Sequence, residues 1–192
     1  MFKIRHISGD LRLGLLDIEQ FSVKSGIQDK RQLEQEGARF LLENIIQEKP
    51  VQVTYDEYGK PHFSNRTEKI AISHSHKWLG VCVNQKEETG LDIELIKEKI
   101  KVIAPKFVND KELEWAYDNE EFLTLIWAAK ESVYKFHGRK RVDFKNHIVV
   151  SKPQSNNEFI AKFNWENFSK EFLLKFEIVQ GYMLTYILNE IK

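Results

Sequence analysis

The chain has 192 residues, of which 42% are hydrophobic and 30% are charged, so it can bury a core and is not expected to be disordered. Its formal net charge is zero, which argues against binding nucleic acid or a membrane through overall charge. The single cysteine, Cys82, excludes an internal disulfide and a zinc site built from several cysteines. No apolar run reaches transmembrane length and no signal peptide is evident, so a cytoplasmic protein is expected.

The first half of the chain predicts strands on either side of one long helix. Two short strands are expected in residues 1–18, separated by the turn-forming Ser8-Gly9-Asp10. Asp29 is the expected N-cap of a helix to about residue 46, because apolar residues recur there every three to four positions and Pro50 stops the pattern. A strand at 51–55, a turn at 56–61, and strands at 69–76 and 77–83 follow.

The second half repeats this order of elements. We expect a strand at 90–96, a short helix at 102–107 and a helix capped by Asp110 that ends near residue 117. The principal helix is capped by Asn119, runs to about residue 136 and ends at His137-Gly138. Strands at 147–151, 159–163, 172–179 and 182–188 complete the chain, with Gln180-Gly181 as a tight turn. The order predicts two α+β lobes, residues 1–88 and 89–192, packed together.

Asp92 and Glu94 are spaced by two in the strand at 90–96, so both point to one face while their apolar neighbours point to the other. Adjacent carboxylates repel each other, and a divalent cation with oxygen ligands removes that penalty. The pair is therefore a candidate magnesium site. Taken alone, the pattern is more often an amphipathic strand with a solvated face.

The principal helix carries an apolar stripe, and Trp127, Glu131 and Lys135 lie at four-residue spacing on its flank, with Lys130 beside them. Glu131 and Lys135 can form an i, i+4 ion pair in the favourable order. On the surface such a pair would contribute about 0.3–0.5 kcal/mol. The functional alternative makes Glu131 a third metal ligand or a general base and places Lys135 on a phosphate.

Three smaller features offer groups that can bind an anion. Ser73-His74 ends a predicted strand with several hydrogen-bond donors, and no cysteine or acid at metal spacing accompanies the histidine. Lys60 and Pro61 follow Gly59 in a turn, which by itself is ordinary. Arg39 lies beside the apolar face of the first long helix, where an arginine usually extends along the surface to reach water.

Four motifs together resemble those of the Sfp-type 4′-phosphopantetheinyl transferases: Gly59-Lys60-Pro61, Ile72–Ser75, Gly90–Glu94 and Trp127–Lys135. Their order and spacing also look like those of the family, and the resemblance covers roughly residues 30–140. The helix that contains Ala38-Arg39 resembles the family more loosely. Asp-x-Glu combined with Trp-x-x-Lys-Glu-x-x-x-Lys is specific, whereas either half alone is not.

The resemblance implies the family's fold and reaction. The fold is α+β, with two similar lobes related by pseudo-twofold symmetry, each with a small antiparallel sheet packed on a long helix. The expected protein is a monomer that binds coenzyme A between the lobes. It would transfer 4′-phosphopantetheine from coenzyme A to a serine of an acyl or peptidyl carrier protein, with Mg²⁺, or Mn²⁺ in its place, as the metal.

Roles carry over from the resemblance by position. Asp92, Glu94 and Glu131 would hold the metal, and Glu131 would also deprotonate the carrier serine. Lys135 would bind the pyrophosphate, so that the catalytic set is Asp92, Glu131 and Lys135. Lys30 and Arg31 are candidates for the 3′-phosphate by position and charge. The residues expected to contact coenzyme A are Arg39, Lys60, Pro61, Ser73, His74, Lys130 and Lys135.

Two other functions stay open as alternatives. A metal-dependent nuclease would use similar residues, but it predicts a strand-borne Glu and Lys and a basic groove, whereas Lys130-Glu131 lies on a predicted helix and the net charge is zero. A non-catalytic module that binds coenzyme A or a carrier protein would not need a costly acidic cluster. The transferase is therefore the preferred hypothesis.

Overall fold

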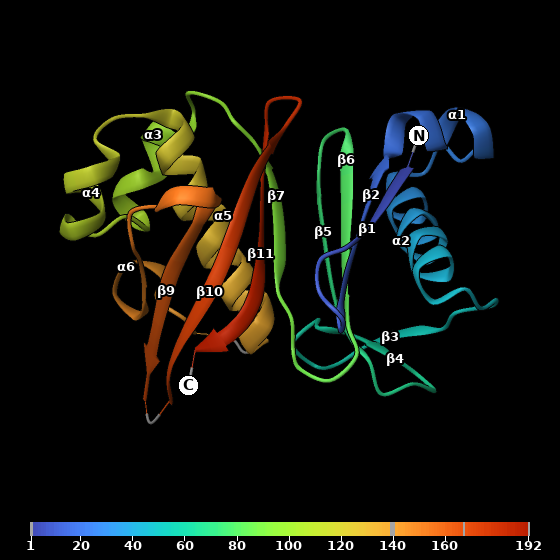
Figure 1. Cartoon of the computed structure of the whole chain (residues 1–192). Coiled ribbons are helices and arrows are strands. Elements are labelled where there is room, and N and C mark those ends of the chain that lie inside the picture. Colours follow the sequence, from blue (N-terminus) through green and yellow to red (C-terminus); the bar gives the residue numbers. More distant parts are fainter. Residues whose placement is uncertain (1, 139–140, 167, 192) are drawn as a thin grey trace.

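Residues 2–84 form the first of two lobes that lie side by side (Figure 1). The structure is a computed structural model and describes residues 2–138, 141–166 and 168–191. The first lobe is a six-stranded antiparallel sheet with strand order β1-β2-β6-β5-β4-β3. Its elements are β1 (Phe2–His6), β2 (Leu11–Asp17), α1 (Ile18–Ser25), α2 (Lys30–Ile46), β3 (Val53–Tyr55), β4 (Pro61–Phe63), β5 (Lys69–Ser75) and β6 (Trp78–Asn84).

The second lobe is a five-stranded antiparallel sheet with strand order β7-β11-β10-β9-β8. The long helix α5 packs against this sheet, and the shorter helices lie on the side of the second lobe that faces away from the first lobe (Figure 1). Its elements are β7 (Leu91–Leu95), α3 (Ile100–Ile103), α4 (Asp110–Ala116), α5 (Glu120–His137), α6 (Phe144–His147), β8 (Ile148–Val150), β9 (Glu158–Trp165), β10 (Phe168–Val179) and β11 (Tyr182–Ile191), with 3₁₀ turns at Ala104–Lys106 and Ser155–Asn157.

The two lobes repeat one topology. In the first, β2 leads through α2 to β3, β4, β5 and β6, and β6 returns to pair with β2. In the second, β7 leads through α5 to β8, β9, β10 and β11, and β11 returns to pair with β7. The repeat confirms the predicted α+β fold of two similar lobes, each with an antiparallel sheet on a long helix. The domain boundary at residue 88 stays a prediction.

Helix boundaries follow from capping side chains. Asp29 accepts a hydrogen bond from the Gln32 amide and starts α2, and Asn119 starts α5 in the same way, as predicted. Gly138 ends α5 in the left-handed conformation, with φ of 70°. The expected cap of α4 was wrong: Asn109 caps this helix through a capping box with Glu112, and Asp110 is its first residue.

The other differences from prediction concern short elements. Helices α1 and α6 and strand β4 were not predicted, and the short helix begins at Ile100 rather than at residue 102. The turn between β10 and β11 was predicted: Gln180 and Gly181 both have positive φ, of 50° and 82°. This is the backbone conformation that a two-residue hairpin requires.

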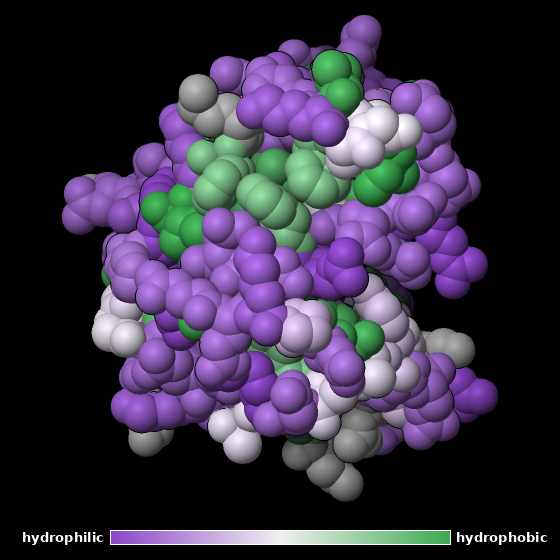
Figure 2. All heavy atoms as spheres, turned by 90° about the vertical axis from the view of Figure 1, so that its right-hand side faces the viewer, coloured by the Kyte–Doolittle hydropathy of each residue, from purple (hydrophilic) through white to green (hydrophobic). Residues whose placement is uncertain are grey.

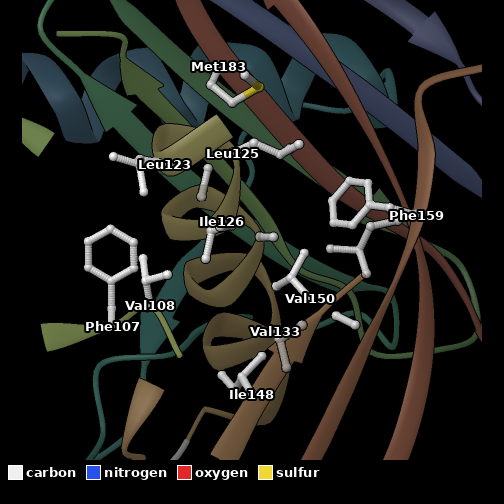
Figure 3. Close-up of a cluster of buried hydrophobic side chains, with 14 of the residues drawn as sticks. Phe107, Val108, Leu123, Leu125, Ile126, Val133, Ile148, Val150, Phe159 and Met183 are labelled. Carbon is white, nitrogen blue, oxygen red and sulfur yellow. The ribbon is translucent and has the colours of Figure 1, made fainter. Parts of the chain in front are cut away.

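The protein has three clusters of buried hydrophobic side chains. The core of the second lobe surrounds α5, and Figure 3 shows side chains of that helix packed among residues of β8, β9 and β11. A separate core lies under α2 in the first lobe. The third cluster joins the lobes, since it combines β2, β5 and β6 with β7 and β11. Cys82 lies in this third cluster, and burial raises the pKa of its thiol to about 12, which fits the expected role of a small apolar residue.

The face of the first lobe that points away from the second is largely hydrophilic, with one gathered apolar patch (Figure 2). On this side, where β1, α1 and α2 meet, the rings of Phe2 and Phe21 pack against Phe40. Among the residues that the structure describes, no helix combines the length and the apolar character needed to cross a membrane.

Lys130 is a fully buried structural residue, and its predicted contact with coenzyme A is wrong. Its side chain is 0% exposed, and its Nζ donates to Glu112 Oε2 at 2.8 Å, to the Phe107 carbonyl at 2.7 Å and to the Phe144 carbonyl at 2.8 Å. Glu112 Oε1 in turn accepts the Val150 amide at 2.8 Å. All three hydrogens of the ammonium are thus used inside the lobe, where they join four segments around α5.

Replacing Lys130 with methionine should destabilise the protein by about 3–5 kcal/mol, because the Glu112 carboxylate would stay buried without its cation. Urea unfolding measures this loss. The control is Lys162→Met, which breaks an exposed pair with Glu171 and should cost less than about 1 kcal/mol. Equal losses in the two variants would contradict the structural role of Lys130.

Candidate active site

The site is built on β7, which lies between the two lobes and has a different environment on each face. Leu91 and Ile93 point into the core shared by the lobes and are at most 1% exposed. Asp92 and Glu94 alternate with them, and Asp92 is only 5% exposed. A carboxylate this deeply buried requires charged or hydrogen-bonding partners.

Asp92 has two such partners, one from each lobe. Ser73 Oγ of β5 donates to Asp92 Oδ1 at 2.6 Å. Lys135 Nζ of α5 donates to the same oxygen at 2.7 Å. The ion pair of Lys135 is therefore with Asp92, and the structure replaces the surface pair with Glu131 that the spacing alone suggested. The Lys135 side chain is 27% exposed, so its ammonium lies at the rim of the site.

Glu131 lies one turn before Lys135 on α5 and is partly buried. Burial is the main cause that raises the pKa of its carboxyl to about 7, and the negative charge of Asp92 raises it further. Lys135 opposes this shift, and Glu94 adds to it. The charges of Asp92 and Glu94 thus reach Glu131, as expected for groups gathered in one place.

The three acids do not form a ready-made metal cage. In residues 2–138, 141–166 and 168–191, no three His, Cys, Asp or Glu side chains are grouped so that they could hold a metal ion. The donor chemistry still fits a hard cation, because carboxylate oxygens are the ligands that Mg²⁺ and Mn²⁺ prefer. The predicted ligands Asp92, Glu94 and Glu131 therefore stay a prediction.

Gly90 explains how β7 comes so close to α5. A Cβ atom at this position would lie 2.0 Å from the carbonyl oxygen of Ser132, the neighbour of Glu131. Only a residue without a side chain permits this contact between two backbones. The glycine therefore sets the distance between the strand that carries Asp92 and Glu94 and the helix that carries Glu131.

Lys60 joins the first lobe to the end of α5. Its Nζ donates to the Phe136 carbonyl at 2.6 Å and forms an ion pair with Glu88 at 2.6 Å. A cation is favourable at a helix C-terminus, where carbonyl groups are exposed. The Lys60 stem packs on Gly138, where an added Cβ would lie 2.5 Å from Lys60 Cδ. This contact could not be predicted from the sequence, because Lys60 and Phe136 are 76 residues apart in the chain.

Two hollows share Ile72 as a lining residue, and the first of them also borders Lys135. The first has a volume of about 190 Å³ and is lined by Lys60, Pro61, Ile72 and Lys135, among others. The second has a volume of about 260 Å³ and is lined by Ile72, Arg39 and neighbouring residues of α2 and β3. Ile72 borders both, so the hollows adjoin and bring Lys60, Pro61 and Arg39 to one side of the site.

The remaining predicted contacts lie at the margin of this side. His74 is about half exposed, with its Nδ1 3.3 Å from Glu34 Oε1. Arg39 pairs with Glu36. Lys30 is 85% exposed and lies 3.8 Å from Glu34 in the first turns of α2. Ser73 differs from these residues, because its hydroxyl is buried and bonded to Asp92.

A third hollow lies on the other side of β7, next to Glu94. Its volume is about 220 Å³, and Leu95, Lys97, Lys99 and Trp127 are among the residues that line it. Trp127 is held there by ring contacts with Phe107 and Phe144. The site therefore has a hollow on each side of the acidic residues.

Replacing Gly90 with alanine should force β7 away from α5, because neither backbone can yield alone. We expect a loss of unfolding free energy of about 1–3 kcal/mol or more. Gly9→Ala is the matched control, since nothing lies within 4 Å of the added Cβ. Chemical denaturation of both variants tests the contact, and wild-type stability of Gly90→Ala would refute it.

The pKa of Glu131 predicts how stability depends on pH in metal-free protein. Between the ordinary pKa of 4.5 and about 7, the folded chain binds a proton that the unfolded chain has lost. Stability should therefore fall as pH rises through this window, by about 2–3 kcal/mol. Glu131→Gln removes the effect, so its stability relative to wild type should rise between about pH 5 and about pH 8. Urea unfolding with a chelator measures the difference, and a constant difference would contradict the shift.

Comparison with known proteins identifies a family. A family model described as the 4′-phosphopantetheinyl transferase superfamily matches residues 88–187, which contain β7 and α5. A Haemophilus influenzae protein named "Putative 4′-phosphopantetheinyl transferase" is 29% identical over 107 residues, covering 50% of this chain and 44% of that protein. The chain thus aligns with less than half of this relative. Because the family model spans more than half of the chain, the chain belongs to the 4′-phosphopantetheinyl transferase superfamily.

Proposed function

We propose that this protein transfers the 4′-phosphopantetheine group of coenzyme A to a serine of an acyl or peptidyl carrier protein. The observation that carries the proposal is the set of three mutually interacting acids next to Lys135, between two lobes of a chain that belongs to this superfamily. The monomeric state and the cytoplasmic location stay predictions.

In this proposal Asp92, Glu94 and Glu131 would hold Mg²⁺, with Mn²⁺ as the alternative. The bound cation would neutralise negative charge on the pyrophosphate of coenzyme A. The chemistry of the ligands supports this assignment, because the charges of Asp92 and Glu94 raise the pKa of Glu131 and a cation would relieve that repulsion.

The residues of the chain would supply proton transfer and charge neutralisation. Glu131 takes the proton of the carrier serine hydroxyl as the general base. The serine oxygen then bonds to the phosphorus next to the pantetheine arm. The bond from that phosphorus to the bridging oxygen breaks, and adenosine 3′,5′-bisphosphate leaves with the electron pair. Lys135 neutralises the charge that develops on this leaving group.

Coenzyme A would occupy the hollow beside Lys135 and the second hollow that shares Ile72 with it. Lys60 and Pro61 line the first, and Arg39 lines the second. His74 lies near the same side through its contact with Glu34 on α2. These cations suit the phosphate groups of the donor, whereas the buried Lys130 has no part in binding it.

The test incubates the protein with coenzyme A, Mg²⁺ and a set of apo carrier proteins, and measures carrier mass. A gain of one phosphopantetheine group is expected. Glu131→Gln should lower kcat by about 100-fold or more, since it removes the base. Lys60→Ala should mainly raise the KM for coenzyme A. Lys162→Ala, at an exposed pair, is the control and should leave both constants unchanged.

Two outcomes would reject the proposal. A carrier of unchanged mass, with coenzyme A bound but intact, would indicate a binding module. Cleavage of DNA in place of carrier modification would indicate a nuclease. Near-normal turnover by Glu131→Gln would leave the transferase in place and refute the role of this residue.

A further inference from the structure

The strand that carries the acids is tied to the first lobe by two serines. β5 and β7 belong to different sheets, yet they lie next to each other between the lobes (Figure 1). Ser73 Oγ donates to Asp92 Oδ1 at 2.6 Å, and Ser75 Oγ donates to Glu94 Oε1 at 3.3 Å. Serines spaced by two thus meet acids spaced by two.

The same hydroxyls also accept hydrogen bonds from the backbone of β7. The Ile93 amide donates to Ser73 Oγ at 3.4 Å, and the Leu95 amide donates to Ser75 Oγ at 3.3 Å. β7 is the edge strand of its sheet, and alternate amides of an edge strand point away from its only neighbour. On this side of β7 the two serine hydroxyls accept the amide hydrogens that a neighbouring strand would otherwise accept.

We propose that Ser73 and Ser75 are positioning residues for the metal-binding acids, and that Ser73 does not bind coenzyme A. Each serine fixes both the backbone of β7 and the carboxylate next to it, so it limits where Asp92 and Glu94 can point. The inference rests on the proposed function, in which these acids hold a divalent cation. It assigns a role to Ser75 and changes the role expected for Ser73.

The geometry predicts that the two serines differ in importance. The bond from Ser73 to Asp92 is short, and it is made in a buried place to a charged acceptor. The bond from Ser75 to Glu94 is longer, and it is only partly buried. Short hydrogen bonds to buried charged groups are the stronger kind. Loss of the Ser73 hydroxyl should therefore matter more.

The metal alone provides a test that does not depend on turnover. Binding of Mn²⁺ to the full chain is measured by electron paramagnetic resonance for wild type, Ser73→Ala and Ser75→Ala. Ser73→Ala should weaken Mn²⁺ binding about tenfold or more, as removal of a partner of a metal ligand commonly does. Ser75→Ala should have a smaller effect in the same direction. Ser73→Thr, which keeps the hydroxyl, should recover most of the affinity.

Controls separate positioning from loss of fold and from contact with the donor. Ser151→Ala removes a hydroxyl that accepts the Ile160 amide at 2.9 Å within the second lobe, and it should bind Mn²⁺ like wild type. Thermal unfolding shows whether each variant is folded. Binding of coenzyme A in the presence of a chelator should be the same for Ser73→Ala and wild type.

Two results would overturn the inference. Wild-type Mn²⁺ affinity in folded Ser73→Ala would do so, especially together with weaker binding of coenzyme A, because the hydroxyl would then contact the donor. A wild-type protein that neither binds Mn²⁺ nor modifies any carrier would reject the proposed function itself, and the inference with it. If the wild-type protein binds Mn²⁺ and modifies a carrier, the serine variants test the inference separately from the proposed function.

Discussion

The close contact between β7 and α5 at Gly90 is the constraint on which the rest of the site depends. The acids reside on two separate elements, and their mutual repulsion would move those elements apart. The backbone contact between Gly90 and Ser132 leaves no room for a side chain between them. Apolar packing on both sides of α5 and β7 supplies the force that holds this contact, since Leu91, Ile93, Leu125 and Val133 are all fully or almost fully buried.

Two kinds of partner stabilise the carboxylate of Asp92, which this packing brings close to the other acids. Lys135 gives Asp92 a cation, and Ser73 gives it a neutral donor. Among the described residues neither kind of donor forms a hydrogen bond with Glu131, and burial together with the charge of Asp92 raises the pKa of its carboxyl to about 7. A carboxyl whose pKa lies near neutrality can act as a proton acceptor.

The sequence predicted what depends on local pattern and on specific motifs. The ends of α2 and α5 follow from Asp29, Asn119 and Gly138, because caps act within one helical turn. The acids and Lys135 were found because two motifs had to be present together. Helix α1 and strand β4 were missed because short elements leave too few residues to establish a period.

The misplaced residues share a different cause, which is that their partners are far away in the chain. Lys130 and Glu131 are neighbours on one helix, and helical spacing alone could not decide which of them faces the core. That choice is made by Glu112, which lies 18 residues earlier and is itself held by Val150. The hydrogen bond of Ser73 to Asp92 was likewise not predicted, because the two residues are 19 positions apart and meet only where β5 lies beside β7.

The bond from Lys60 to the end of α5 has a mechanical consequence. Polar contacts connect the lobes at three places. The serines of β5 bond to β7, Lys60 bonds to the Phe136 carbonyl, and Arg5 pairs with Glu177 of β10 at 2.5 Å. Because these three contacts lie at separate places, rotation of one lobe relative to the other would break at least one charged or buried hydrogen bond. Opening of the lobes would therefore cost the free energy of at least one of these contacts.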